Sequence, residues 1–297
     1  MSGGLDSQLA VRVLQRAGAE VEAVTFSTPF FKPREAEEAA AALGVRLHVI
    51  DFTDDLLALI QNPPHGFGGA MNPCIDCHAR MIRRAGELMT ELGFDFVATG
   101  EVAGQRPMSQ NRQSLVTVEK SSGLKGRLVR PLSAKLLEPT IPELESRLNR
   151  AALLDISGRS RDRQIALAAE WGIEHYPSPA GGCKLTEEGY SRKLRDLMTH
   201  EGFANRRLIE FLSVGRHFRL PDGTGLVMGR DQNENALLDA ASDLGEIFQV
   251  EGVPGPHTLI IGGAKSDADR VLAETITRMY LKDSTIDRNL YKGYHIC

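Results

Sequence analysis

The sequence predicts an α/β fold, in which a doubly wound parallel sheet is followed by a smaller α+β domain. Three observations carry this prediction. Apolar runs that suit strands alternate with amphipathic runs that suit helices over residues 1–100, and such alternation is typical of a parallel sheet covered by helices on both faces. A glycine turn stands directly before the first helical run. After residue 200 the segments become shorter and richer in turns.

The composition narrows the classes of protein. The 297 residues, 42% hydrophobic and 25% charged, suit one large domain or two modest ones. No apolar run approaches the roughly 18 residues that span a bilayer, so we expect no membrane association and a cytoplasmic protein. The net charge of −4 allows a local basic face but no uniformly basic surface. Four cysteines are too few for a disulfide scaffold and favour a reducing compartment.

The opening stretch "MSGGLDSQLAVRVLQ" predicts a phosphate-binding loop. Gly3 and Gly4 allow the backbone to approach an anion, and the hydroxyls of Ser2 and Ser7 can donate hydrogen bonds to it. Asp6 would repel bare phosphate unless Mg²⁺ or a substrate hydrogen bond offsets the repulsion. The alternative is a plain glycine turn with Asp6 as the helix N-cap.

A helix over residues 7–17 follows, with one apolar face and its N-terminus directed at the loop. The next elements are predicted in order as strand 21–26, helix 33–43, strand 45–52, helix 55–61, helix 80–92 and strand 94–100. Ligands bind at the carboxyl ends of parallel strands. Thr25, Phe26, Thr99 and Gly100 are therefore expected to converge on the opening loop.

The second domain is predicted to begin after the helix "EEGYSRKLRDLMTH", which gives domains of residues 1–200 and 201–297. Segments 213–230 and 254–263 are interpreted as hairpin-like β structure. A closing helix is predicted over residues 267–280.

Three cysteines form the second candidate site. Cys74 and Cys77 have C-x-x-C spacing in a Gly/Pro loop just before a helix, and Cys183 lies in another such loop. The pattern fits half a zinc site, a redox dithiol or part of an iron–sulfur cluster. His78 could supply a fourth ligand, but three thiolates alone suit a [4Fe–4S] cluster with one open iron. Unrelated cysteines are the alternative, and Cys297 is interpreted as a bystander.

Basic residues gather around these motifs. Between residues 105 and 135 seven lysines and arginines face a single acid, Glu119, and more arginines follow at 159–163. Because phosphate contacts dominate affinity for nucleic acids, we hypothesise a positive track for RNA. An ordinary solvated surface is the alternative. The residues proposed to contact RNA here are Arg112, Arg127, Arg130, Arg159 and Arg161.

The segment of residues 2–7 resembles the S-G-G-x-D-S signature of the PP-loop ATP-pyrophosphatase superfamily. The resemblance implies an adenine nucleotide alpha hydrolase-like fold and cleavage of ATP between its α- and β-phosphates, with Mg²⁺. The family's first strand, which precedes this loop, is missing, so we expect a longer native chain, and an intact mass of 32.5 kDa would contradict that expectation. The expected nucleotide-contacting residues are Ser2, Gly3, Gly4, Leu5, Asp6, Ser7, Thr25, Phe26, Thr99, Gly100 and Gln105.

Three further stretches sharpen the resemblance. "MNPCIDCHARM" resembles the N-P-C-x-x-C segment of tRNA 2-thiouridylases, whereas "TGEVAGQRPMSQ" and "RPLSAK" are similar to segments of tRNA 4-thiouridine synthases. Together they imply an ATP-dependent tRNA uridine sulfurtransferase; whether O2 or O4 of the base is replaced stays open. Glu101 stands where the synthases have Asp, and their RNA-capturing N-terminal domain is absent.

The resemblance assigns roles to individual residues. Asp6 and Lys135 would serve the adenylation of the base, and Cys74 and Cys183 the transfer of sulfur. Sulfur would arrive from a donor as a persulfide derived from a cysteine desulfurase, or as sulfide on the open iron. Zinc and metal-free persulfide chemistry are the alternatives to a cluster held by Cys74, Cys77 and Cys183.

The C-terminal blocks "GRHFRL", "VMGRDQNENALL" and "VPGPHTLIIGG" resemble the NFACT-R domain of RNA-associated proteins. The resemblance implies that Arg230 contacts RNA. Asp231 and Pro256 depart from the family pattern. The alternative is that the polar residues of these blocks merely cap hairpins.

Two rival functions remain open. A PP-loop enzyme acting on a small molecule would not need the basic loops. A non-catalytic RNA-binding protein that senses nucleotide would release no pyrophosphate even with tRNA present.

Overall fold

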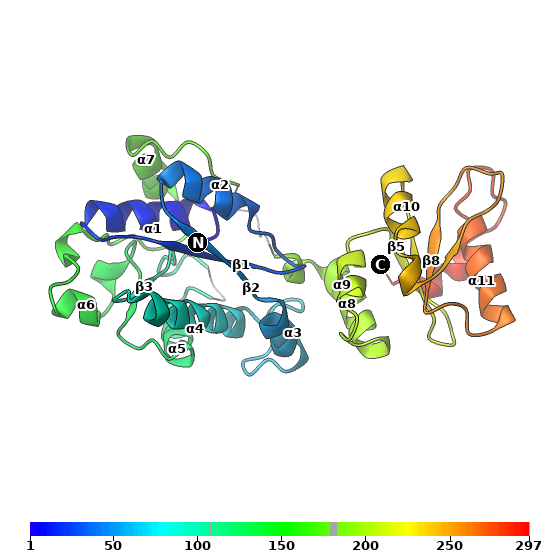
Figure 1. The fold of residues 1–297 in the computed structure, drawn as a ribbon, viewed down its shortest axis with the longest axis horizontal. Helices are drawn as coiled ribbons and strands as arrows, with labels where there is room; N and C mark the ends of the chain where they lie inside the picture. The colour runs from blue at the N-terminus through cyan, green and yellow to red at the C-terminus, as the bar shows by residue number, and fades with distance from the viewer. Residues whose placement is uncertain (107–108, 179–182, 297) are drawn as a thin grey trace. The chain divides into compact units, whose positions relative to one another are not determined.

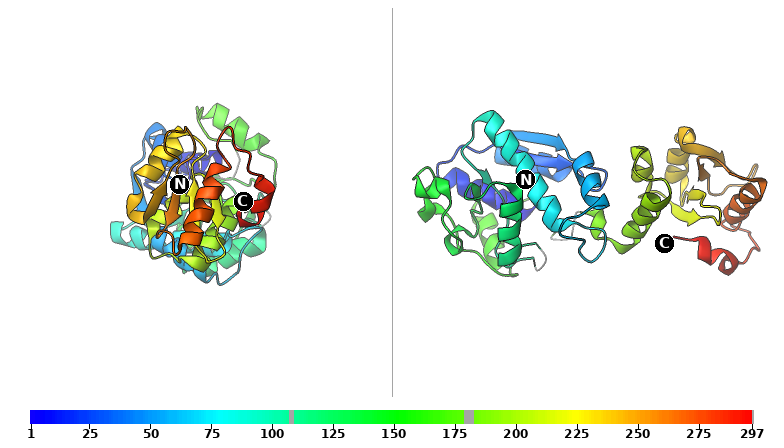
Figure 2. Two further views of the ribbon diagram at one scale, coloured as in Figure 1. Left: turned by 90° about the vertical axis from the view of Figure 1, so that its right-hand side faces the viewer. Right: turned by 90° about the horizontal axis from the view of Figure 1, so that it is seen from below.

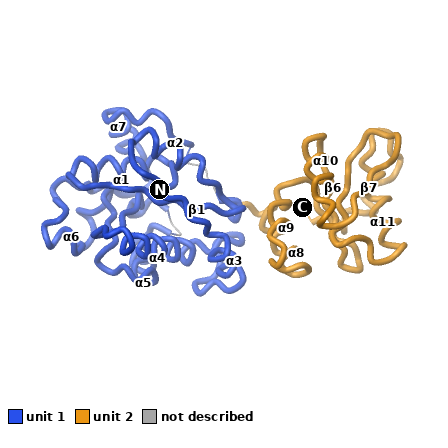
Figure 3. The backbone as a smooth tube through the Cα atoms, in the orientation of Figure 1, with its two compact units in different colours: residues 1–186 blue, residues 187–297 orange. Residues whose placement is uncertain are grey.

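The computed structural model describes residues 1–106, 109–178 and 183–296. They form two compact units, residues 1–186 (unit 1) and residues 187–297 (unit 2), which Figure 3 draws in different colours. Cys297, expected to be a bystander, lies outside the described residues, as do positions 179–182 of the loop before Cys183.

Unit 1 alternates helices and strands as the sequence predicts. In order, its elements are α1 (Leu5–Arg16), β1 (Ala23–Ser27), α2 (Arg34–Leu43), β2 (Leu47–Asp51), α3 (Thr53–Gln61), α4 (Cys74–Leu92), β3 (Val97–Ala98), α5 (Arg112–Ser122), β4 (Leu128–Val129), α6 (Ile141–Leu144) and α7 (Asp162–Glu170).

The strands of unit 1 pair in parallel. β1 pairs with β2 from Ala23 opposite Leu47 to Ser27 opposite Asp51, and β3 pairs with β4 through Val97 and Ala98. Helices α1, α2 and α7 lie on one side of these strands and α3, α4 and α5 on the other (Figure 1 and Figure 2). This two-sided cover confirms the predicted α/β class.

Two apolar clusters hold these layers together. On one side, Leu9 and Val13 of α1 belong to the cluster of Val129 and Leu132, which follow β3 in the chain. On the other side, residues of α4 pack against the paired strands. The members of this second cluster are Ala79, Ile82, Ala85, Met89, Val97, Val118 and Leu128. The β3–β4 pair is thus buried from both faces, which fixes the end of β3 that faces the opening loop.

Two elements differ from their predicted bounds by more than two residues at one end. Helix α4 begins at Cys74 instead of residue 80, because the Cys77 amide donates to the Pro73 carbonyl (2.8 Å) and starts the helical ladder inside the proline-containing stretch. The C-x-x-C pair is therefore in the first turn of a helix and not in a loop before it. The predicted strand 94–100 keeps ladder pairing only at Val97 and Ala98.

Unit 2 is an α+β unit built on an antiparallel sheet. Its elements are α8 (Glu188–His200), α9 (Arg206–Phe211), β5 (Arg216–Arg219), β6 (Gly225–Met228), α10 (Gln232–Asp239), β7 (Gly245–Phe248), β8 (Thr258–Ile261) and α11 (Asp267–Arg278). The strand order is β5-β6-β8-β7, and Ala273 and Ile276 of α11 pack with Phe218 and Ile260 of the sheet.

Helix α8 lies in the compact unit 2, which begins at residue 187. The cause is Arg219 of β5, whose guanidinium pairs with Asp196 of α8 (2.5 Å) and with Glu201 just beyond the helix (2.6 Å). These partly buried ion pairs tie the helix to the sheet.

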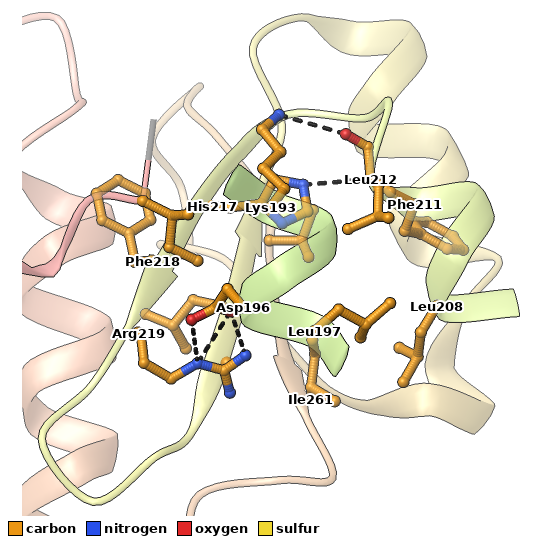
Figure 4. A pocket seen from close by; sticks show the side chains of 14 residues that line it. Lys193, Asp196, Leu197, Leu208, Phe211, Leu212, His217, Phe218, Arg219 and Ile261 are labelled. Carbon is orange, nitrogen blue, oxygen red and sulfur yellow. Dashed lines mark hydrogen bonds and ion pairs between the residues drawn. The ribbon is translucent and has the colours of Figure 1, made fainter. Parts of the chain in front are cut away.

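A small cavity lies between α8, α9 and the sheet of unit 2 (Figure 4). Its volume of about 10 Å³ gives room for about one water molecule. Beside it, the Nε2 of His217 donates to the carbonyls of Val214 (3.0 Å) and Phe211 (3.2 Å). Burial lowers the pKa of His217 to about 3, so this residue is a neutral structural donor.

None of the helices in the described ranges combines the length and the apolar character needed to cross a membrane.

Candidate active site

The opening loop packs tightly enough that glycine is required in it. Gly3 has a φ of +78°, and a Cβ there would lie 2.2 Å from the Glu35 carbonyl oxygen at the start of α2. Helix α1 begins at Leu5, and no side chain caps it at Gly4. The first amides of an uncapped helix lack intrahelical partners, and together with the helix dipole they favour an anion.

Asp6 and Gln105 meet beside this loop. The Gln105 amide donates to Asp6 Oδ2 (2.9 Å). The other oxygens of the pair, Asp6 Oδ1 and Gln105 Oε1, are buried and have no hydrogen-bond partner among the described residues. Buried oxygens are seldom left unpaired, and carboxylate and amide oxygens are the ligands that Mg²⁺ prefers. These two atoms therefore fit a magnesium ion beside the phosphates of ATP.

The carboxyl end of β3 abuts the loop directly. A Cβ at Gly100 would lie 2.7 Å from the backbone of Asp6 and Ser7. The structure therefore brings Gly100 to the loop as the topology predicts, and Gln105, which the family resemblance implied as a nucleotide contact, also lies there. In β1, Thr25 is buried and Phe26 packs on Phe52 with ring centres 5.3 Å apart.

Gln8 is a site residue that sequence reasoning missed. Its side chain is buried, and Nε2 donates both to the Gly3 carbonyl (2.7 Å) and to the His175 carbonyl (2.9 Å). It therefore holds the opening loop against the segment that leads to Cys183. The sequence did contain a signal for this role, because Gln8 is a polar residue on the otherwise apolar face of α1.

A buried network of charges connects the cysteine helix to the end of β3. Glu101 accepts from Arg130 Nε (2.9 Å) and lies 3.5 Å from His78 Nδ1. Burial alone would raise the pKa of Glu101, but His78 and Arg130 outweigh it and lower the pKa to about 2. Arg130 also pairs with Glu119 (3.0 Å).

This network gives two of the predicted residues different surroundings from those expected. Arg130, proposed as an RNA contact, is buried with its guanidinium engaged inside unit 1. His78, considered as a fourth metal ligand, faces Glu101.

The structure brings the three cysteines into one region. Asn72 Nδ2 donates to Cys74 Sγ (3.1 Å), and the amide after Cys183 donates to the Phe30 carbonyl (3.3 Å), beyond the end of β1. Burial raises the pKa of the Cys77 thiol, and the charges of Cys183 and Cys74 raise it further, as expected for neighbouring sulfurs. They are thiols and not disulfides.

The same sulfurs do not form a finished metal cage. Within the described ranges, no group of three or more Cys, His, Asp or Glu side chains is arranged to hold a metal ion. Asp76, between the two cysteines of α4, instead accepts from His65 at both its ring Nδ1 (2.6 Å) and its backbone amide (2.9 Å). This pair closes the loop before α4.

Lys135 and the predicted RNA contacts other than Arg130 are exposed or partly exposed, whereas the side chain of Leu5, an expected nucleotide contact, is buried. The Lys135 ammonium donates to the Ala151 carbonyl (2.9 Å). Arg230 pairs with Glu234 on α10 (3.0 Å). The predicted RNA contacts that lie on the surface or partly on it are Arg112, Arg127, Arg159 and Arg161.

Comparison with known families matches each unit to a separate model. Residues 1–123 match the tRNA methyl transferase HUP domain, and residues 215–288 match the NFACT protein RNA binding domain. The first match covers the opening loop, the C-x-x-C pair and the end of β3. The second lies wholly inside unit 2. Both resemblances noted in the sequence are thereby confirmed at the level of these domains.

Relatives with assigned names align with part of the chain. A probable tRNA sulfurtransferase of Caldanaerobacter subterraneus subsp. tengcongensis is 33% identical over 133 residues, covering 42% of this chain and 33% of its own. A tRNA-specific 2-thiouridylase MnmA of Syntrophotalea carbinolica is 32% identical over 121 residues, covering 35% and 33%. A tRNA-specific 2-thiouridylase MnmA 1 of Syntrophus aciditrophicus is 27% identical over 222 residues, covering 68% and 55%. The chain thus spans between a third and somewhat over half of these relatives.

Proposed function

Because the chain carries a HUP domain of the tRNA methyl transferase type and an NFACT-type RNA-binding domain, we propose that it is an ATP-dependent tRNA uridine sulfurtransferase. The observation that carries this proposal is that unit 1 holds both an uncapped helix start behind a glycine loop, which suits a phosphate, and three cysteines, two of them in the first turn of α4. Thiolation of a base needs both, because the carbonyl oxygen must be activated before sulfur can replace it.

The proposed reaction has two steps, and in each step one bond forms as another breaks. A uridine carbonyl oxygen attacks the α-phosphate of ATP, the bond to the β-phosphate breaks, and pyrophosphate leaves. A sulfur nucleophile then attacks the activated carbon, and the carbon–oxygen bond breaks to release AMP. The chain's contribution to the first step is positioning and charge stabilisation.

The residues of the opening loop divide this work. Backbone amides at the start of α1 would hold the departing pyrophosphate, and the unpaired oxygens of Asp6 and Gln105 would hold Mg²⁺, which would neutralise phosphate charge. Lys135 is proposed to stabilise the same charge, and for that its ammonium has to leave the Ala151 carbonyl.

The cysteines are proposed to hold a [4Fe–4S] cluster through Cys74, Cys77 and Cys183, with Cys74 and Cys183 serving sulfur transfer. The presence of three cysteines rather than two supports this choice over a metal-free persulfide, and each thiol becomes a thiolate when it binds a metal. The sulfurs have to draw closer to ligate one cluster. A persulfide or sulfide is the proposed sulfur donor.

The proposed partner is tRNA, in a reducing cytoplasm that keeps the thiols available. Arg112, Arg127, Arg159 and Arg161 are proposed to contact its phosphates, since their side chains are exposed or partly exposed. Arg130 supports the site from inside by holding Glu101.

Anaerobic purification tests the cluster. Iron and acid-labile sulfide are assayed beside the visible absorption spectrum for the wild type, Cys183→Ala and the control Cys297→Ala. About four irons and four sulfides per chain are expected, lost in Cys183→Ala and kept in the control. Zinc, or no metal in any variant, would contradict the cluster and leave persulfide chemistry.

Pyrophosphate release tests the activity. The purified chain with ATP is expected to release pyrophosphate only when unmodified tRNA is added. Release without tRNA would mean that an acceptor other than the tRNA base, such as water, takes the nucleotidyl group, which would contradict tRNA as the substrate. No release at all would contradict an enzyme of this kind.

A further inference from the structure

An open groove in unit 2 has a volume of about 920 Å³, at the upper end of the range of roughly 300–1,000 Å³ for ligand clefts. It is lined by the start of β5, the first turn of α10, the loop of residues 249–257 and residues from Tyr280 to Arg288. All of these lie inside the stretch that matches the RNA-binding family model. The groove is separate from the small cavity beside His217.

The walls of the groove carry an excess of positive charge. Four cations, Arg216, Arg230, Lys282 and Arg288, line it against two carboxylates. Arg230 is neutralised by Glu234. The other three cations have no carboxylate partner in the part of the chain that the structure describes, so their charge is available to an anion.

Two of these cations share one aromatic ring. The guanidinium carbons of Arg216 and Arg288 lie 4.7 Å and 4.5 Å from the centre of the Tyr280 ring. The ring attracts each cation and so helps to hold both guanidinium groups at the wall of the groove. Neither has a carboxylate partner among the described residues, and guanidinium groups match phosphate geometry well.

The opposite wall is fixed before any ligand arrives. The Asn235 side chain donates to the Gly255 carbonyl and accepts from the His257 amide, both at 3.0 Å, and so holds the loop of residues 249–257. Glycine is needed for this packing, because a Cβ at Gly229 would lie 2.2 Å from Asn235 Oδ1 and one at Gly255 2.3 Å from Leu281. A preformed wall lowers the entropic cost of binding.

We propose that this groove binds the sugar–phosphate backbone of unpaired RNA, with Arg216, Lys282 and Arg288 on the phosphates. This proposal rests on the proposed function. It adds that the ligand of unit 2 is the single-stranded part of the RNA partner. Unpaired RNA is favoured over a duplex because Gln232 and Gln249 expose side-chain amides along the groove. Such groups can reach base edges only when the bases are not paired.

Fluorescence anisotropy of the full chain with a short, labelled, mixed-sequence RNA strand tests the proposal. In the Lys282→Ala/Arg288→Ala variant, Kd is expected to rise about tenfold, and the slope of log K against log salt to fall by about 1.4, the loss of two single-strand phosphate contacts. Lys282→Glu alone, at an exposed position, is expected to weaken binding as well.

Arg278→Ala is the matched control, since Arg278 is an exposed cation of α11 outside the groove. An equal loss in this control, or unchanged binding in both groove variants, would overturn the site. Competition by an RNA duplex as strong as that by the unlabelled strand would overturn the preference for unpaired RNA. This binding experiment contains no ATP, so its result does not depend on the pyrophosphate assay. A failure of the pyrophosphate assay would count against the proposed function and not against the groove as an RNA-binding site.

Discussion

At the scale of single residues, the chemistry of unit 1 depends on atoms that the fold leaves without protein partners. Asp6 Oδ1 and Gln105 Oε1 are buried acceptors that face the opening loop. Leaving such groups unsatisfied costs about 1–3 kcal/mol each. A bound cation removes that cost, so binding of magnesium nucleotide and stability of the loop are coupled.

Asp6→Asn is expected to lose this coupling. The amide keeps the size of the carboxylate but not its charge, so addition of Mg²⁺ should no longer tighten ATP binding, and the affinity for magnesium ATP should fall at least about tenfold, roughly 1.4 kcal/mol. Titration calorimetry with and without Mg²⁺ measures the effect. Asp95→Asn, an exposed carboxylate paired with Arg147, serves as the control, and a similar loss there would contradict a magnesium role for Asp6.

Gln8→Leu is expected to loosen the loop without removing any group that touches ATP. The Gly3 and His175 carbonyls would lose their shared donor, which costs on the order of 1–3 kcal/mol per buried group. Denaturant unfolding should show reduced stability, and the KM for ATP should rise. Gln15→Leu, a change of the same type on the half-buried surface of the same helix, should leave both quantities close to wild type; if it matches Gln8→Leu, Gln8 has no special role.

At the scale of elements, the loop depends on how closely the end of β3 approaches it. In Gly100→Ala the new Cβ would lie 2.7 Å from the backbone of Asp6 and Ser7, and such overpacking costs typically about 1–3 kcal/mol. We expect weaker ATP binding and a lower midpoint of chemical unfolding. Gly69→Ala is the control, because a Cβ at Gly69 meets no atom within 4 Å.

The sequence predicted the elements whose signal is local. Helix α1 and strands β1 and β2 follow from clear apolar periodicity, and the opening loop from contiguous residues. Helix α5 was not predicted, because eight of its eleven positions are polar and its buried Val118 packs with residues of the distant helix α4. The start of α4 was placed too late because Pro73 was interpreted as part of a loop, although proline is well tolerated beside a helix N-terminus.

The residues of the candidate site also fall into those that local sequence predicts and those that it does not. The loop and the cysteines were found by type and spacing, whereas Gln8 and the Glu101–Arg130 pair act through partners far along the chain. Arg130 was predicted to be a surface cation, but it is buried because Glu101 and Glu119 pair with it from other parts of unit 1. Tertiary contacts determine this kind of pairing, so a local stretch of sequence does not predict it.

At the scale of the molecule, the two units should lose stability in different ranges of pH. His217 in unit 2 has its pKa lowered by burial from 6.5 to about 3, so the unfolded chain binds the proton first and stability falls as pH drops from about 6.5 towards 3. Glu101 in unit 1 has a pKa lowered from 4.5 to about 2, so its contribution is lost only as pH falls from about 4.5 towards 2.

Two probes separate these transitions. The single tryptophan, Trp171, lies in unit 1, so its fluorescence follows that unit, while far-ultraviolet circular dichroism follows both. Acid titration should show a change in dichroism before the change in fluorescence. His217→Gln should shift the first change to lower pH, and the exposed His200→Gln should not; coincident transitions in the wild type would contradict the assignment.

The hydrogen bond from Gln8 to the His175 carbonyl joins residues 167 positions apart. A protein emerges from the ribosome at roughly 5–20 residues per second, so about 8 to 33 seconds separate the synthesis of Gln8 from that of the carbonyl that accepts its hydrogen bond. Until then the nascent chain contains the opening loop but not the segment that supports it. A ribosome stalled before residue 175 would therefore carry a chain whose opening loop lacks this support.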